Sequence, residues 1–154
     1  MNPNLTIRPA TIDDVPAVVQ MLADDFLGEQ RERFEDPLPE SYVQAFREIE
    51  NDPNNELIVA ESDGEIVGTF QLTYTPSLSF QGSKRCTVES VRVDSRLRGR
   101  GIGREMMFWA IEHAKEKGCI SMQLTTHSER KDAHRFYEQM GFKTTNLGMK
   151  LKLK

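Results

Sequence analysis

A segment rich in glycine and arginine near the middle of the chain is a candidate anion-binding site. It reads VESVRVDSRLRGRGIGR from Val88 to Arg104, a strand-like stretch that leads through a glycine-rich turn into a helical pattern. A helix N-terminus presents free backbone N–H groups and the positive end of the helix dipole, which together bind anions. Glycine lets the backbone approach an anion closely, and arginine adds charge-assisted hydrogen bonds. The segment therefore predicts a phosphate-binding loop from Arg98 to Arg104.

Two common nucleotide-binding patterns do not fit this loop. A P-loop requires G-x-x-x-x-G-K-[ST], and neither Gly99 nor Gly101 begins that sequence. A dinucleotide fingerprint requires G-x-G-x-x-G, but its third glycine would fall on Arg104 or Met106. The acidic residue that such a fingerprint needs about twenty positions later, at a strand end, is also missing. The loop therefore indicates a phosphate-bearing ligand of another kind.

Two motifs of the chain resemble the GNAT superfamily of acyl-CoA-dependent N-acyltransferases. Arg98 to Gly103 match the [QR]-x-x-G-x-[GA] signature of that family. Ala133 to Phe142, AHRFYEQMGF, are similar to the A-x-x-[FL]-Y-x-x-x-G-F pattern of the family, at the end of a helix. A helix and a strand separate the two motifs, as in the family. The resemblance covers nearly the whole chain, because the order of the expected elements also fits.

The resemblance implies that acetyl-CoA is the acyl donor and that CoA is a product. Its pantetheine arm would pair, like an added β-strand, with the backbone of Val91, Arg92 and Val93. In the family that strand splays from the strand after the helix, here Ile120 to Thr125, and the acetyl group lies in the resulting cleft. Many members have asparagine where this chain has Arg130. The implied diphosphate site comprises Arg98, Gly99, Arg100, Gly101, Ile102, Gly103 and Arg104.

Tyr137 is the candidate general acid. Attack of an amine on a thioester expels a thiolate, which needs a proton. A phenol has a reference pKa of ~10 and is therefore protonated at neutral pH, so it can donate to that thiolate. The alternative is that Tyr137 is only the polar edge of an amphipathic helix, since Ala133, Phe136, Tyr137 and Met140 recur at helical spacing.

Glu89 is the candidate general base. On a regular strand it shares a face with Val91 and Val93, where a carboxylate is unexpected unless it lines a cleft or a β-bulge reverses the alternation. An amine acceptor is mostly protonated at pH 7, so a group must accept its proton. Glu89 would do so directly or through water; otherwise it is a surface or structural carboxylate. A backbone amide near Val91 is the candidate donor to the oxyanion.

The residue patterns around these motifs predict one α/β domain over residues 1–154. We expect a mixed, mostly antiparallel sheet of about seven strands, flanked by about four helices. The last strand is expected because Met149, Leu151 and Leu153 alternate with lysines, as in an edge strand. The predicted helices cover residues 11–28, 39–51, 102–117 and 133–140. Thr11 and Asp14 resemble a capping box at the start of the first helix, and Asp63-Gly64 predicts a hairpin between two strands. The predicted strands cover residues 5–9, 57–60, 66–74, 87–93 and 120–125, a strand from residue 142, and residues 149–153.

Composition limits the classes of protein that the chain can represent. It has 154 residues, of which 38% are hydrophobic and 29% are charged, which is typical of a globular protein in the cytoplasm. No apolar run reaches the ~20 residues of a membrane span, so no membrane partner is expected. The first eight residues lack the apolar core of a signal peptide. Cys86 and Cys119 form no close-spaced pair and the histidines no ligand cluster, so no metal site is expected.

Charge is distributed unevenly along the sequence. Residues 24–63 contain thirteen acidic residues and three arginines, whereas the whole chain has a net charge of −4. The basic residues gather in the glycine-rich loop rather than over a broad surface, so no nucleic-acid partner is expected. The acidic segment consists either of solvated helix faces or of a rim that attracts a cationic partner.

These observations predict an N-acetyltransferase that acts by direct attack in a ternary complex. Neither cysteine lies in a nucleophile motif, which disfavours a covalent enzyme intermediate. The acceptor would be a primary amine of a small molecule, with a cationic metabolite as the first expectation. The alternatives are a protein or peptide amine, or a CoA-binding regulatory module without catalysis. The alternating C-terminal strand would allow a homodimer.

Overall fold

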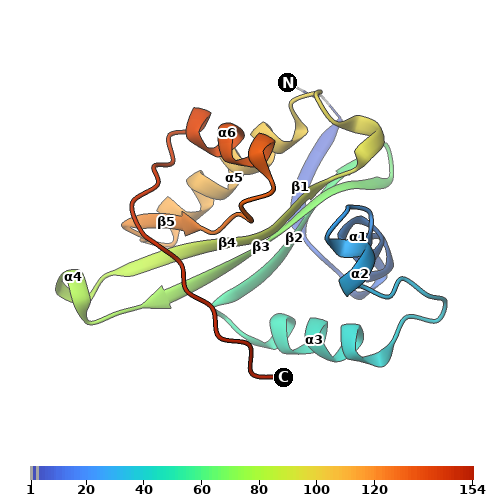
Figure 1. The fold of residues 1–154 in the computed structure, drawn as a ribbon, viewed down its shortest axis with the longest axis horizontal. Coiled ribbons are helices and arrows are strands. Elements are labelled where there is room, and N and C mark those ends of the chain that lie inside the picture. Colours follow the sequence, from blue (N-terminus) through green and yellow to red (C-terminus); the bar gives the residue numbers. More distant parts are fainter. Residues whose placement is uncertain (1, 3) are drawn as a thin grey trace.

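The structure, a computed structural model, describes residue 2 and residues 4–154; residues 1 and 3 of the predicted domain lie outside this part. Its centre is a mixed sheet with the order β1-β2-β3-β4-β5 (Figure 1). The first three pairings are antiparallel and the β4–β5 pairing is parallel. The strands are β1 (Leu5–Pro9), β2 (Asn55–Ser62), β3 (Glu65–Pro76), β4 (Lys84–Val93) and β5 (Ser121–Leu124).

Helices cover both faces of this sheet. Figure 1 shows α5 and α6 on one side and α1 to α3 on the other. The helices are α1 (Val15–Ala23), α2 (Gly28–Arg31), α3 (Glu40–Asn51), α4 (Ser79–Gly82), α5 (Ile102–Glu116) and α6 (Lys131–Gln139). Short 3₁₀ turns precede α1 (Ile12–Asp14) and α5 (Ser95–Leu97).

Local sequence signals determine where several of these elements begin and turn. Thr11 and Asp14 form the expected capping box, in which the Thr11 backbone N–H donates to the Asp14 carboxylate at 2.7 Å. Arg8 binds the same carboxylate at 2.7 Å, which joins β1 to the start of α1. Asp63 and Gly64 both have positive φ, as a tight hairpin between β2 and β3 requires.

The main core lies between the sheet and α5. Met106, Met107 and Ala110 of α5 are completely buried against the sheet, where Phe70 and Leu72 of β3 are also completely buried. Each large apolar side chain buried in this way contributes about 1.5–3 kcal/mol of stability. This packing holds the start of α5, and with it the glycine–arginine loop, at the end of β4.

The predicted strand and helix counts were wrong. The described residues form five strands and six helices, instead of about seven strands and four helices. The short helices α2 and α4 lie in segments with no apolar periodicity, so the sequence pattern does not reveal them. Residues 142–154 form no strand, because an alternating segment becomes a strand only where another strand pairs with it. Among the described helices, none combines the length and the hydrophobicity needed to cross a bilayer.

Candidate active site

The glycine–arginine loop ends in a free helix N-terminus. Gly99 and Gly101 have φ near +80°, a left-handed conformation that glycine adopts without strain. Gly101 is the N-cap of α5, and the first helical bond runs from the Glu105 N–H to the Gly101 carbonyl at 3.1 Å. Among the hydrogen bonds of the described residues, none uses the backbone amides of residues 99–104. The loop therefore offers consecutive unpaired N–H groups to an anion.

The arginines of this loop differ in their availability. Arg96 is bound to Asp94, with 2.7 Å between its guanidinium and the carboxylate, so its charge is neutralised locally. Arg98, Arg100 and Arg104 are exposed. Their positive charges therefore surround the free amides from the solvent side, as a bound diphosphate would require.

The strands β4 and β5 are paired over only part of their lengths. The parallel ladder joins Arg85–Val88 to Ser121–Leu124, whereas β4 continues to Val93. Beyond Val88, the edge of β4 that faces β5 has no ladder partner in the described sheet. The backbone of Val91, Arg92 and Val93 lies in this unpaired stretch. The end of β4 can therefore accept an extended ligand as an added strand.

A β-bulge separates Glu89 from the valines that follow it. Ser90 has a φ of +54°, and the register with β3 shifts between Gln71–Glu89 and Thr69–Arg92. Val91 and Val93 consequently pack against the main core, while Glu89 is exposed on the opposite face. The alternation is thus reversed, the second of the two arrangements that the sequence left open. The carboxylate of Glu89 is therefore accessible to a ligand that approaches from solvent.

Tyr137 lies on the inner face of α6 and is partly buried. Its ring packs edge-on against Phe136 and Phe142, with centroid distances of 5.2 and 5.7 Å. Burial raises the pKa of the Tyr137 phenol, and the positive charges of Arg92 and Arg130 oppose that rise. The phenol therefore keeps its proton at neutral pH, as a general acid must before it donates.

Arg92 and Arg130 share one carboxylate close to this tyrosine. The Asp25 Oδ2 atom lies 3.1 Å from the Arg92 Nε and 3.0 Å from an Arg130 Nη. Burial disfavours the charged form of the Asp25 carboxylate and would raise its pKa. Hydrogen bonds from the amides of Gly28 and Leu27 and the charges of the two arginines have the larger, opposite effect, so the pKa of Asp25 is lowered to about 2. Two positive charges and one negative charge thus meet beside Tyr137, with an excess of one positive charge.

The position of Asp25 depends on a break between α1 and α2. Its Oδ1 atom accepts hydrogen bonds from the amides of Leu27 at 2.8 Å and Gly28 at 2.7 Å. A side chain at Gly28 would collide with the backbone carbonyl of Leu22, so only glycine fits there. Sequence reasoning expected Gly28 to end a helix and did not single out Asp25, because one aspartate in an acidic run carries no local signal.

The cysteines do not take part in this site. Burial raises the pKa of the Cys86 thiol to about 12, and burial also raises the pKa of Cys119. Neither residue therefore provides a thiolate nucleophile at neutral pH.

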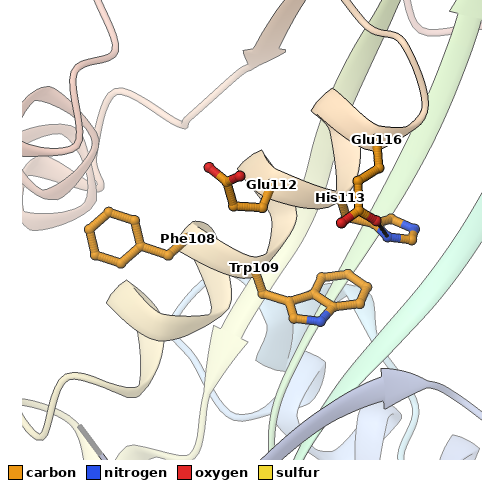
Figure 2. Close-up of a pocket in the computed structure, with 5 residues that line it drawn as sticks. All are labelled: Phe108, Trp109, Glu112, His113 and Glu116. Carbon is orange, nitrogen blue, oxygen red and sulfur yellow. Dashed lines mark ion pairs between the residues drawn. The ribbon is translucent and has the colours of Figure 1, made fainter.

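A hollow of about 310 Å³ on the outer face of α5 is not part of the site. Figure 2 shows its five side chains along one helix, and no residue of the predicted site lines it. Trp109 and His113 stack there at 4.5 Å, and His113 also lies 3.1 Å from the Glu56 carboxylate. His113 is partly buried and joins α5 to β2.

Comparison with known proteins places this geometry in a family. The acetyltransferase (GNAT) family model matches residues 19–142. An aminoalkylphosphonate N-acetyltransferase of Salmonella typhimurium is 28% identical over 94% of this chain and 88% of its own length. A glucosamine 6-phosphate N-acetyltransferase of Arabidopsis thaliana is 27% identical over 71% of this chain and 74% of its own length.

A solved structure agrees with the fold throughout. A protein of Bacillus halodurans C-125, described as a transcriptional regulator, is 57% identical and has a TM-score of 0.94, over 97% of this chain and 99% of its own. The glycine–arginine loop and the helix of Tyr137 both fall within the matched family region. The chain belongs to the GNAT family of N-acetyltransferases, enzymes that take the acetyl group from acetyl-CoA and release CoA.

Proposed function

We propose that this N-acetyltransferase acetylates the primary amine of a small molecule that also carries a phosphonate or phosphate group. The observation that carries the proposal is the pair of guanidinium groups, Arg92 and Arg130, beside Tyr137. Asp25 neutralises only one of these two charges. A doubly charged oxyanion is the ligand that arginine pairs bind best, because guanidinium groups form charge-assisted hydrogen bonds with it.

The donor site fits acetyl-CoA on two structural grounds. The loop of residues 98–104 has free amides and three exposed arginines for the diphosphate. The unpaired stretch of β4 at Val91–Val93 has backbone groups for the pantetheine arm. When bound, acetyl-CoA supplies a thioester carbonyl that an amine nitrogen can attack.

Side chains at the end of β4 and on α6 supply the proton transfers. Tyr137 holds a proton on its phenol oxygen and donates it to the departing sulfur. Glu89, exposed on the open face of β4, accepts the proton of the amine directly or through water. The backbone amide of Val91 donates to the oxyanion. Transfer is direct, because the raised pKa values of both cysteines leave no thiolate to form a covalent intermediate.

The acceptors of two relatives support an anionic group on the substrate. Aminoalkylphosphonate and glucosamine 6-phosphate both combine an amine with a phosphorus oxyanion. The prediction of a cationic acceptor depended on the acidic residues of segment 24–63, but several of these are engaged in different parts of the fold. Glu61 binds Arg8, Glu56 binds His113, and Asp25 binds the two arginines. These three carboxylates are therefore already paired and are not free to attract a cationic acceptor.

Steady-state kinetics with matched amines tests the proposal. An ω-aminoalkylphosphonate should have a higher kcat/KM than an alkylamine or a diamine of equal length, and added salt should reduce this preference. Arg130→Gln should raise KM for the phosphonate by about 10- to 100-fold, because a charge-assisted hydrogen bond is lost. Arg135→Gln is the matched control, since Arg135 is exposed on α6, the helix that Arg130 precedes, and among the described residues its ion pair is with Asp132. Preference for the diamine would instead support a cationic acceptor.

A further inference from the structure

Asn2 connects the segment before β1 to the first turn of α5. Its backbone N–H donates to the two oxygens of the Glu105 carboxylate at 3.2 and 3.3 Å, and its side-chain amide also donates to Glu105 Oε2. The same side-chain amide donates to the backbone carbonyl of Arg100 at 3.1 Å. Asn2 therefore contacts the glycine–arginine loop and the helix that follows it, although Arg100 lies 98 positions and Glu105 103 positions away in the sequence.

The sheet holds Asn2 in this place. The Leu5 backbone N–H donates to the Asn2 carbonyl at 3.0 Å, and Leu5 pairs with Ser62 in the antiparallel ladder of β1 and β2. Asn2 and Glu105 are both partly buried. The sheet thereby provides, through Asn2, a fixed support for a loop that lies outside it.

The hydrogen bond to Arg100 determines the orientation of one free amide in the loop. A trans peptide is planar, so the Arg100 carbonyl and the Gly101 N–H point in opposite directions. Gly99 and Gly101 have φ of +80° and +82°, and two glycines so close together allow the peptide between Arg100 and Gly101 to rotate at little cost. Because Asn2 binds the carbonyl, the Gly101 N–H is kept pointing away from Asn2, where no backbone acceptor of the described residues binds it.

The hydrogen bonds to Glu105 restrain a negative charge beside the same loop. Glu105 is the acidic residue in the first turn of α5, and that end of a helix attracts carboxylates and phosphates alike. Within residue 2 and residues 4–154, the hydrogen bonds to this carboxylate all come from Asn2. Without Asn2, the carboxylate would be free to pair with the exposed arginines of the loop and to compete with a diphosphate for them.

We propose that Asn2 is a positioning residue for acetyl-CoA. It holds the Gly101 N–H ready for the diphosphate and keeps the Glu105 carboxylate away from the arginines that would bind it. This inference rests on the proposed donor site at residues 98–104. A loop that is already ordered loses less conformational freedom when its ligand binds. Asn2 should therefore govern the affinity for the donor rather than the rate of acetyl transfer.

Calorimetry with CoA and steady-state kinetics with acetyl-CoA test this role. Asn2→Ala should raise the Kd of CoA and the KM of acetyl-CoA by about 10-fold and leave kcat unchanged, because the side-chain hydrogen bonds to Arg100 and Glu105 are lost. Asn2→Asp keeps the shape of the side chain, but its carboxylate cannot donate to these oxygens and adds a negative charge. This variant should therefore bind CoA more weakly than Asn2→Ala does.

Variants of Asn4 provide the matched controls, because Asn4 is exposed in the same segment. Asn4→Ala should bind CoA like the wild-type protein, and Asn4→Asp should stay within about twofold of the wild-type Kd, since an exposed charge is screened by salt. A wild-type Kd for Asn2→Ala would overturn the proposal. So would equal CoA affinities of Asn2→Asp and Asn4→Asp, or a lower kcat for Asn2→Ala with an unchanged KM.

Gly101→Val separates this inference from the proposed donor site, because it alters the loop itself. If Gly101→Val and Asn2→Ala both bind CoA normally, the loop does not hold the diphosphate and the donor-site proposal fails. If Gly101→Val weakens CoA binding and Asn2→Ala does not, the loop holds the diphosphate but Asn2 does not position it. Circular dichroism of each variant establishes that it is folded.

Discussion

Replacing Asp25 with asparagine tests the three-residue charge cluster beside Tyr137. The folded protein lowers the pKa of Asp25 from its usual 3.8 to about 2, and its side chain is only 7% exposed. This lowering of the Asp25 pKa corresponds to ~2 kcal/mol of pH-dependent stability. At neutral pH the substitution should cost more, roughly 3–5 kcal/mol, because Arg92 and Arg130 would remain partly buried without their carboxylate.

The direction of the pH dependence follows from the lowered pKa. Asp25 is charged in both the folded and the unfolded chain above about pH 5, so its full contribution is present there. As the pH falls from 3.8 toward 2, Asp25 becomes protonated in the unfolded chain but stays charged in the folded protein. The stability that Asp25 contributes is therefore lost over this pH range. Urea unfolding followed by circular dichroism between pH 7 and pH 2 measures the effect. The free energy of unfolding should fall by ~2 kcal/mol more in the wild-type protein than in Asp25→Asn.

Asp132→Asn provides the control for this experiment. Asp132 also binds an arginine, Arg135 at 3.0 Å, but its side chain is fully accessible to solvent. An exposed ion pair contributes little to stability, so this variant should unfold like the wild-type protein at every pH. Equal pH dependence in the wild-type protein and Asp25→Asn would refute the cluster as described. The excess positive charge that we assign to the acceptor site would then have no structural basis.

Three further predictions concern the donor site and the proton transfers. Acetyl-CoA at one hundred times its Kd should stabilise the folded protein by ~2.7 kcal/mol, measured as a rise in Tm. Gly101→Val should abolish this rise, because valine is strained at the φ of +82° that Gly101 adopts. The control Gly148→Ala should retain the rise. Tyr137→Phe should lower kcat by ~10²- to 10⁴-fold with little change in acetyl-CoA affinity, and an unchanged single-turnover rate would reduce Tyr137 to a packing residue. Glu89→Gln should lower the turnover rate at neutral pH, and the rate of this variant should recover at higher pH, where more of the amine is unprotonated. If the variant has the pH profile of the wild-type protein, Glu89 is not the general base.

The sequence predicted the parts of the fold that depend on local patterns. The hairpin at Asp63–Gly64 and the capping box of Thr11 and Asp14 are confirmed, because each requires only neighbouring residues. The mixed, mostly antiparallel sheet is confirmed as well. The two C-terminal strands were wrong for the opposite reason. A strand needs a pairing edge, and no pattern within residues 142–154 specifies which edge provides it.

The proposed donor half and acceptor half of the candidate site also differ in whether neighbouring residues or distant segments form them. The donor half follows from one continuous segment, since the end of β4, the loop and the start of α5 occupy residues 88–104. The proposed acceptor half joins Asp25, Arg92 and Arg130, which lie far apart in the sequence. Their meeting depends on the bulge at Ser90, which fixes the side of β4 that carries Arg92, and on Gly28, which allows the turn that holds Asp25. In this chain, the proposed donor site is therefore encoded locally, whereas the proposed acceptor site forms only when distant elements pack together.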